Sequence, residues 1–290
     1  MILPRFEFLE PETFEGVAQI AEKHKGDALI MAGGTDLLVN LKRKIIKAKV
    51  VISLGKIPAL KQIHYTEKDG LTLGAMVTIN ELAESPVIQK HFPLLSTAAT
   101  KLGSPQIRNR ATVGGNVYTA RPAGDTIGPL LAYGAEVQLV KGKESRWEPL
   151  SKFINGPGKT TRANGEVLAV IKLKPLPAGT GVSYIKYGVR KAMEIAMVSI
   201  TTAVTVKNGE CKDARIILGA VGPTFIRSLS AEESLRGQKI SDLIAGKACD
   251  LAANSCTPIT DVRASAEYRS DLVQALTKRG IMEAAAQAIA

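Results

Sequence analysis

The segment Ala32-Gly33-Gly34-Thr35-Asp36 limits the possible folds of this 290-residue chain more than any other part of the sequence. It follows an apolar run at 28–32 that is typical of a short buried strand, and it precedes a helical pattern that begins at Leu37. Another apolar run, at 50–54, predicts the next strand. Because a strand–turn–helix–strand order places its two strands side by side and parallel, residues 1–57 predict a small α/β unit.

A second Gly-Gly pair lies in Ala111-Thr112-Val113-Gly114-Gly115-Asn116, at the end of a predicted loop over 103–115. Glycine allows a positive φ and carries no Cβ, so backbone N–H groups of both segments can converge on an anion. Thr35 and Thr112 add hydroxyl groups. Neither segment is G-x-G-x-x-G, so a Rossmann site is not predicted, but two such loops can clamp a pyrophosphate. Because an acid beside phosphate repels it, we expect the Asp36 carboxylate to cap the following helix or to turn away.

The rest of the chain alternates between helical and strand patterns, and a Pro/Gly-rich segment at 175–181 predicts a domain boundary near residue 177. The predicted helices are 11–24, a capped helix from Thr78, 94–102, 241–254 and 270–288. The predicted strands are 62–65, 71–74, 135–140, 167–173, 195–206 and 214–220.

The chain is basic, with 38 Lys and Arg against 27 Asp and Glu, a formal net charge of +11. Such an excess suggests nucleic-acid binding, but aromatic residues make up only 4% of the chain, so stacking platforms for bases are few. The basic run at 42–49 is the one candidate patch. A solvated helix face followed by a strand, with Ile45 and Ile46 pointing inward, explains this run better.

Two further observations concern the cellular setting. The N-terminus has no signal-peptide pattern, and no stretch approaches the roughly 18 apolar residues of a membrane span. Cys211, Cys249 and Cys256 form no C-x-x-C pair, which fits a reducing cytoplasm and argues against an iron–sulfur cluster or structural zinc in this chain.

The segment Gly156-Pro157-Gly158-Lys159-Thr160 looks like the end of a nucleotide-binding P-loop. The full pattern needs a glycine where this chain has Phe153, and neither a clean strand nor a capped helix flanks it. We therefore expect a surface turn.

Three segments together resemble the FAD-binding medium subunit of the molybdenum hydroxylases, a family that includes bacterial xanthine, carbon monoxide and nicotinate dehydrogenases. They are Ala32–Asp36, Gly103–Asn116 and Arg121–Asp125. The resemblance covers essentially the whole chain, with later markers at 156–159, 186–196 and 261–269. The segments 156–159 and 261–265 are most similar to xanthine dehydrogenase-type flavin subunits.

The resemblance implies an α+β fold. It divides the chain into a two-subdomain FAD-binding region of the PCMH/vanillyl-alcohol-oxidase-like type, residues 1–177 (subdomains 1–57 and 58–177), and a C-terminal α+β domain of the CO dehydrogenase flavoprotein type, residues 178–290. It also implies a cytoplasmic FAD-dependent oxidoreductase subunit with no nucleic-acid partner and no integral membrane association.

In the implied electron path, a large partner subunit holds molybdopterin cytosine dinucleotide or a related molybdenum cofactor. A small partner subunit holds two [2Fe-2S] clusters and delivers electrons to FAD in this chain, and NAD⁺ or another acceptor receives them. Two alternatives stay open: a basic nucleic-acid-binding module, and a stand-alone FAD oxidoreductase of the same fold.

The resemblance further implies which residues bind FAD, whereas it implies no catalytic side chain and no metal ligand in this chain. The first loop would wrap the pyrophosphate with Ile30, Met31, Ala32, Gly33, Gly34, Thr35, Asp36 and Leu37. The second segment would add Thr112, Gly114, Gly115, Asn116 and Thr119, and Asp125 matches an acid that contacts FAD. Leu102, where the family often has an aromatic residue, and Leu168 would border the isoalloxazine ring. Lys186 matches a lysine beside the flavin, where a cation favours the reduced form; a surface salt bridge is the alternative for it.

Overall fold

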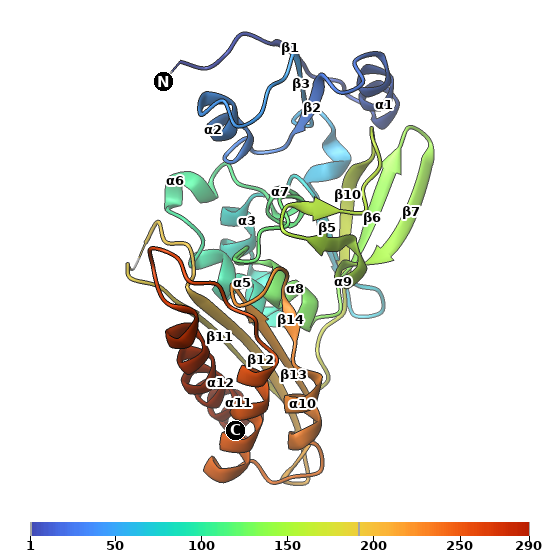
Figure 1. Ribbon diagram of the computed structural model, residues 1–290. Coiled ribbons are helices and arrows are strands. Elements are labelled where there is room, and N and C mark those ends of the chain that lie inside the picture. The colour runs from blue at the N-terminus through green and yellow to red at the C-terminus, as the bar shows by residue number, and fades with distance from the viewer. Residues whose placement is uncertain (1, 191, 290) are drawn as a thin grey trace.

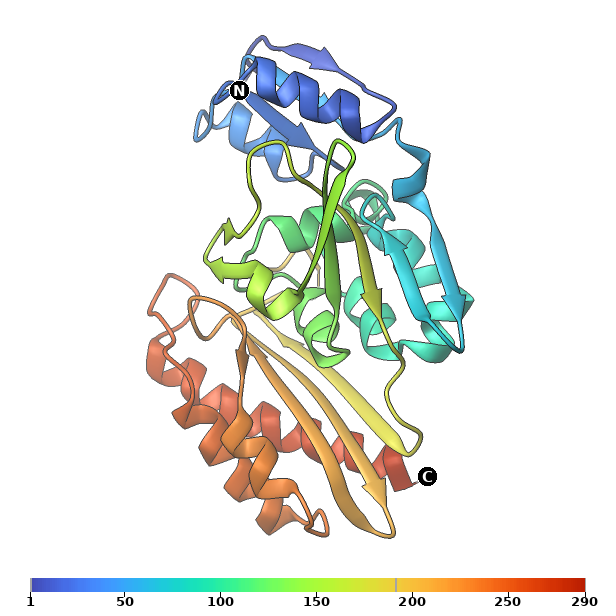
Figure 2. The same cartoon turned by 90° about the vertical axis from the view of Figure 1, so that its right-hand side faces the viewer.

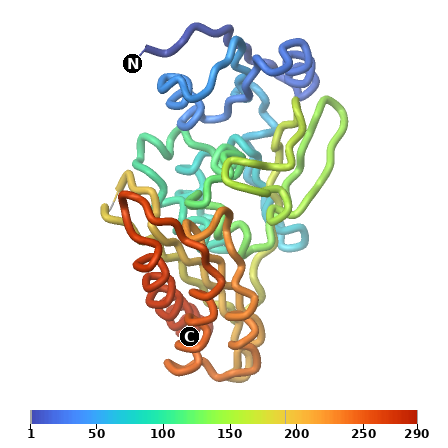
Figure 3. Tube along the Cα trace, in the orientation of Figure 1, coloured from blue at the N-terminus to red at the C-terminus, as the bar shows by residue number. Residues whose placement is uncertain are grey.

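A computed structural model describes residues 2–190 and 192–289 (Figure 1). Met1, Lys191 and Ala290, which belong to the predicted ranges 1–57 and 178–290, lie outside the described residues. The chain runs from a small N-terminal sheet, through a larger middle sheet, to a C-terminal sheet, so its two ends lie at opposite parts of the molecule (Figure 3).

The N-terminal unit is a three-stranded parallel sheet in the order β1-β3-β2. Its elements are β1 (Glu7–Leu9), α1 (Phe14–Lys23), β2 (Ala28–Met31), α2 (Leu37–Lys42) and β3 (Val50–Ser53). The predicted parallel pairing of 28–32 with 50–54 is confirmed, with Ala28 opposite Val50. All four residues of the central strand β3 are buried, as expected for a strand covered on both faces.

The middle unit is a five-stranded antiparallel sheet in the order β4-β5-β10-β6-β7, packed against short helices. The strands are β4 (Ile63–Thr66), β5 (Gly70–Gly74), β6 (Glu136–Lys141), β7 (Glu144–Pro149) and β10 (Val167–Leu173). The helices are η1 (Pro58–Lys61), α3 (Ile79–Glu84), α4 (Pro86–His91), α5 (Pro93–Thr100), α6 (Pro105–Arg108), α7 (Val113–Tyr118), α8 (Ile127–Ala132) and α9 (Leu150–Phe153). One hydrophobic core, which includes Val17, Leu73 and Leu139, joins this unit to the N-terminal one.

The C-terminal unit is an antiparallel sheet in the order β11-β12-β13-β14, with long helices along one face (Figure 2). Its strands are β11 (Thr180–Tyr187), β12 (Val198–Lys207), β13 (Glu210–Gly219) and β14 (Ile226–Arg227), and its helices are α10 (Leu229–Leu235), α11 (Asp242–Asn254) and α12 (Ala266–Ile289). Helices α5 and α8 of the middle unit also pack on this sheet, α5 on β11 and α8 on β12 and β13. Helices of the middle unit and helices of the C-terminal unit therefore both pack on this sheet.

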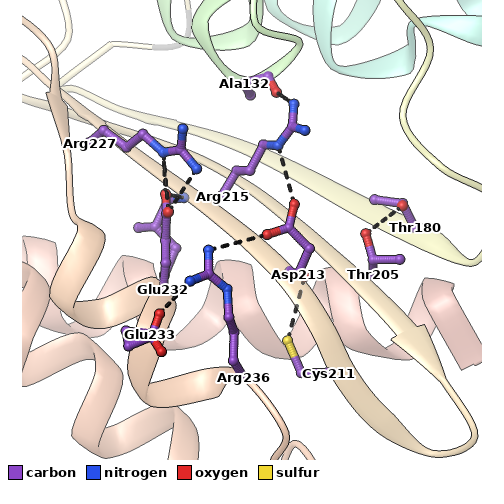
Figure 4. A network of polar contacts seen from close by, with 11 residues as sticks. Ala132, Thr180, Thr205, Cys211, Asp213, Arg215, Arg227, Glu232, Glu233 and Arg236 are labelled. Atoms are coloured by element: carbon purple, nitrogen blue, oxygen red, sulfur yellow. Dashed lines mark hydrogen bonds and ion pairs between the residues drawn. The ribbon is translucent and has the colours of Figure 1, made fainter.

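Charged side chains on β13 reinforce this junction (Figure 4). Arg215 donates to the carbonyl oxygen of Ala132 at the end of α8 and pairs with Asp213. Nearby, Arg227 holds the fully buried Glu232 carboxylate through two nitrogens, at 2.9 Å each. These contacts connect the C-terminal sheet to the middle unit and to its own helix α10.

Two local expectations were wrong. The predicted loop over 103–115 contains α6 and the start of α7, because side chains cap both short helices: the Ser104 oxygen accepts from the Ile107 N–H, and the Thr112 oxygen from the Gly115 N–H. In the basic run, the helix ends at Lys42, and Ile45 is 63% exposed rather than inward.

The predicted turn near Gly156 is confirmed. Strands β8 (Ile154–Gly156) and β9 (Lys159–Thr160) form a hairpin, and the Gly158 N–H donates to the carbonyl oxygen of Ala120. In the described ranges, none of the helices has the length and apolarity that crossing a membrane requires.

Candidate cofactor-binding site

The first Gly-Gly loop presents a row of open hydrogen-bond donors. It connects β2 to α2, and Gly34 turns it with a φ of +77°. Within the described residues, the N–H groups of the five positions 33–37 have no acceptor, and the helical pattern starts only with the bond from Leu38 N to Gly34 O. Consecutive free N–H groups in a turn are an arrangement that binds phosphate oxygens.

The structure brings the second Gly-Gly segment directly against this loop. A Cβ built on Gly33 would lie 1.8 Å from the carbonyl oxygen of Arg110, so the first loop passes the second at a distance that only glycine permits. A Cβ on Gly115 would lie 3.8 Å from that of Ala32. The two segments, about 80 residues apart in the sequence, are therefore neighbours in space.

In the second segment the N–H groups of Gly114, Gly115 and Asn116 already have protein acceptors, which differs from the expectation that N–H groups of both segments point to an anion. The N–H of Gly114 donates to Ala75 O at 2.9 Å, that of Gly115 to Thr112 Oγ1 at 3.0 Å, and that of Asn116 to Thr112 O at 2.9 Å. These bonds build helix α7. What the second segment offers to a ligand is a surface without a Cβ at Gly115, beside the donors of the first loop.

Gly114 is required for packing. A Cβ there would lie 2.4 Å from the Cβ and 2.7 Å from the carbonyl oxygen of Ala75, which belongs to the chain directly after β5. The N–H of Ala75 in turn donates to Ala169 O. Gly114 thus lets α7 lie close to the strand that carries Leu168.

Asn116 and Thr119 act within the protein fold. The Asn116 side-chain oxygen accepts from the hydroxyl of Thr126 at 2.7 Å and from its N–H at 3.3 Å, and the Thr119 hydroxyl donates to the Asn116 carbonyl oxygen. These bonds tie α7 to the turn that precedes α8. That turn contains Asp125, so Asn116 helps to fix the position of this acid.

Asp125 lies in a buried polar group with two residues of β11. Its carboxylate accepts from the Tyr184 hydroxyl at 3.0 Å and pairs with the Lys186 Nζ at 2.9 Å; the Asp125 and Lys186 side chains are 9% and 7% exposed. Burial raises the pKa of Asp125, opposed by the Lys186 charge, and it raises the pKa of Tyr184 well above its usual value. The salt bridge of Lys186 is therefore buried, unlike the surface pair considered as its alternative.

Sequence reasoning missed Tyr184. A tyrosine in an apolar strand is usually a core residue, so its type gave no signal. The signal available was its spacing: residues two apart on a strand face the same side, which places Tyr184 with Lys186.

The remaining predicted residues are hydrophobic or exposed. Leu102 and Leu168 are 7% and 5% exposed and belong to the same core. Leu168 borders an irregularity in the pairing of β10 with β6. Asp36 precedes α2, but its exposed side chain makes no capping hydrogen bond. Of the two expected roles of the Asp36 carboxylate, capping of α2 is therefore excluded, and the side chain is exposed.

Comparison with known proteins identifies the family. The family model of the FAD binding domain in molybdopterin dehydrogenase matches residues 4–176, and that of the CO dehydrogenase flavoprotein C-terminal domain matches 183–284. The chain is 31% identical to the putative xanthine dehydrogenase FAD-binding subunit of Escherichia coli (strain K12), over 90% of each chain. It is 32% identical to the nicotine 6-hydroxylase medium subunit of Paenarthrobacter nicotinovorans, over 99% of this chain and 100% of the relative.

A solved structure supports the same assignment. Carbon monoxide dehydrogenase from Hydrogenophaga pseudoflava contains a chain that matches with a TM-score of 0.95 and 30% identity, over 99% of both chains. The α+β fold class and the family resemblance predicted from the sequence are thereby confirmed. This chain belongs to the FAD-binding medium subunits of the molybdenum hydroxylase family, and it is a flavoprotein subunit of an oxidoreductase.

Proposed function

We propose that the first Gly-Gly loop, residues 30–37, holds the pyrophosphate of FAD, and that the second segment covers it from the other side. The observation that carries this proposal is the row of N–H groups at 33–37 without a protein acceptor, next to the Cβ-free surface of Gly115. A dianionic pyrophosphate needs close donors and few competing side chains, and the Asp36 carboxylate is exposed and makes no capping bond to these N–H groups.

The ring end of the cofactor would meet a different set of residues. Leu102 and Leu168 would provide apolar walls for the isoalloxazine, and the Asp125–Lys186 pair would lie beside it. The bound flavin supplies the ability to exchange both single electrons and electron pairs. The chain itself binds the cofactor, excludes water from the apolar wall and sets the local charge.

We infer that this subunit takes electrons from the [2Fe-2S] clusters of a small partner and passes them to NAD⁺ or another acceptor. A large partner with the molybdenum cofactor would oxidise the organic substrate. Support comes from relatives named as medium subunits or chains, which implies assemblies of several chains. The three free cysteines are consistent with a cytoplasmic setting.

Among the members of the family, we propose a xanthine dehydrogenase-type complex. The Gly156–Lys159 hairpin and the segment 261–265 support this grouping, as does the 31% identity to the Escherichia coli subunit. The nicotine and carbon monoxide relatives have comparable identities, 32% and 30%, so a test on purine substrate with the complete complex decides the substrate class.

We also propose two domains, residues 1–177 and 178–290. The middle sheet ends with β10 at Leu173, and the C-terminal sheet starts with β11 at Thr180. The Pro/Gly-rich segment between the two strands supports a boundary near residue 177.

Substitution Gly33→Ala tests the cofactor site. The added Cβ would lie 1.8 Å from Arg110 O, so the loop must shift, and we expect FAD affinity to fall at least about tenfold in titrations followed by flavin fluorescence. Gly246→Ala is the matched control, because a Cβ in that helix meets no atom within 4 Å. A wild-type chain that takes up no FAD, or a Gly33→Ala chain that binds it as well as the control, contradicts the proposal.

A further inference from the structure

Two lysines fasten the end of α5 to strand β11 in a reciprocal way. The Lys101 Nζ donates to the carbonyl oxygen of Tyr184 at 2.9 Å, and the Lys186 Nζ donates to the carbonyl oxygen of Lys101 at 3.0 Å. Lys186 thus binds the backbone of Lys101 itself, and Lys101 binds the backbone two residues before Lys186. We call Lys101, Tyr184, Lys186 and the Asp125 carboxylate between them the lysine clasp.

The clasp is held by more than these two bonds. Lys186 and Tyr184 both donate to Asp125, and the Lys101 Nζ lies 5.4 Å from the centroid of the Tyr184 ring, within cation–π distance. The cost of burying the Lys101 ammonium lowers its pKa. Asp125, Tyr184 and the Lys186 side chain are buried, whereas Lys101 is an exposed residue whose ammonium closes the network at the surface. Because buried polar groups are costly when unsatisfied, the hydrogen bonds among them favour a single arrangement of the two segments.

The clasp acts on the segment that carries Leu102. Four consecutive carbonyl oxygens, those of residues 100–103, accept hydrogen bonds. Arg108 donates to those of residues 100 and 102, Lys186 to that of residue 101, and the Met193 N–H to that of residue 103 at 3.1 Å. Two of these donors, Lys186 and Met193, come from the C-terminal part of the chain. The turn at Leu102 is therefore fixed from both sides of the junction.

We propose that Lys101 is a positioning residue for the flavin. Through the clasp, Lys101 would hold Leu102 in place. Strand β11 of the C-terminal sheet would thereby fix the position of one apolar side chain of a site that belongs mainly to residues 1–177. This inference rests on the proposed function, because it requires Leu102 to border the isoalloxazine ring.

Substitution Lys101→Met in the full-length chain tests it. Methionine keeps the length of the side chain but removes the donor and the charge. Loss of one charge-assisted hydrogen bond predicts amide hydrogen exchange about tenfold faster in peptides covering 99–104, already without FAD. With FAD bound, we expect a shifted flavin absorbance spectrum and reduction potential, and a dissociation constant raised about fivefold.

Two further variants complete the design. Lys90→Met removes an exposed lysine from the last turn of α4 and should change neither the amide exchange of 99–104 nor the flavin properties. Lys101→Arg keeps a cationic donor and should return the amide exchange and the flavin properties most of the way to those of the wild type. A circular dichroism melt of each variant checks that it is folded.

The possible results separate two failures. If Lys101→Met matches Lys90→Met in exchange, or exchanges faster while its flavin spectrum and potential stay unchanged, the positioning role is wrong. If the wild-type chain takes up no FAD, the proposed function fails instead, whatever the exchange of 99–104 shows.

Discussion

Single glycines in the two Gly-Gly segments meet different physical requirements. Gly33 permits close contact with the backbone at Arg110, Gly34 supplies a positive φ, and Gly114 makes room for Ala75. Among the described residues, the first segment has a row of five N–H groups without a protein acceptor, whereas those of Gly114 and Gly115 in the second segment are bonded. The two motifs look alike in the sequence, but one leaves a row of N–H groups open and the other forms a helix that packs against a strand.

This difference predicts different effects for neighbouring substitutions. Gly114→Ala forces a Cβ within 2.4 Å of the Ala75 Cβ and should reduce the free energy of unfolding by about 1–3 kcal/mol. Gly115→Ala meets first the Thr112 Oγ1 at 3.0 Å, a single contact that is less close than those at Gly114, and should cost less than about 1 kcal/mol. Its main effect should be weaker FAD binding. Urea unfolding and FAD titration of both variants check this, and equal losses of stability would show that the contact with Ala75 is not decisive.

Elements with a strong pattern of apolar residues were predictable, and short ones were not. Helix α1 buries Val17 and Ala21 on the predicted face, and strands β2, β3, β10 and β12 lie within or close to their predicted ranges. Helices of four to six residues, such as α6 and α7, are too short to be stable by propensity. They form because caps and tertiary contacts hold them, which leaves little signal in the local sequence.

The ion pairs of the segment between α11 and α12 share one carboxylate, that of Asp261. Asp261 accepts from Arg263 at 2.6 Å and from Arg269 at 2.9 Å, and Arg269, only 1% exposed, donates to the carbonyl oxygen of Met197 in the turn before β12. Hydrogen bonds from Arg263, together with the Arg269 charge, hold the pKa of Asp261 well below its usual value of 3.8. The contact therefore couples this segment to the C-terminal sheet through ionised groups.

The pH dependence follows from the direction of this shift. Since the pKa is lower in the folded state, the stabilisation by Asp261 is complete above about pH 5 and is lost as the pH falls through 3.8 and below. We expect Asp261→Asn to melt at a lower temperature at neutral pH, because it leaves the Arg269 charge unpaired. Its melting temperature should fall less on acidification than that of the wild type. Circular dichroism melts of both proteins from about pH 5 to below pH 3.8 measure these melting temperatures. If the melting temperatures of the two proteins fall in parallel with pH, the ion pair does not have this role.

At the scale of the whole molecule, the three larger sheets of the described residues follow one another along the chain, and the candidate site takes its residues from all three. The first loop comes from the N-terminal sheet, α7 and Leu168 from the middle unit, and Lys186 from the C-terminal sheet. We propose that such a site binds and tunes the cofactor, whereas substrate oxidation would belong to a partner chain.

The isolated chain should therefore bind FAD but not oxidise an organic substrate. We expect no turnover of a purine in a dye-reduction assay unless the partner subunits are added. The co-expressed complex is the positive control, and the FAD-loaded chain alone is the test. Robust oxidation by the isolated chain would show that the subunit assignment is incomplete and would favour a stand-alone oxidoreductase.

The sequence alone determined the parallel N-terminal unit and the paired Gly-Gly segments, because these depend on local physics, and it indicated the family through the resemblance of three segments. Glycine conformation, apolar periodicity and motif spacing are all readable within a few dozen residues. The tertiary structure decided which N–H groups stay open and which charges pair. The acceptors of the Val113 and Gly114 N–H groups lie at Val77 and Ala75, and Lys186 meets Asp125 and Lys101 from 61 and 85 residues away. Contacts across such separations leave no local pattern, because the fold alone brings their partners within hydrogen-bonding distance.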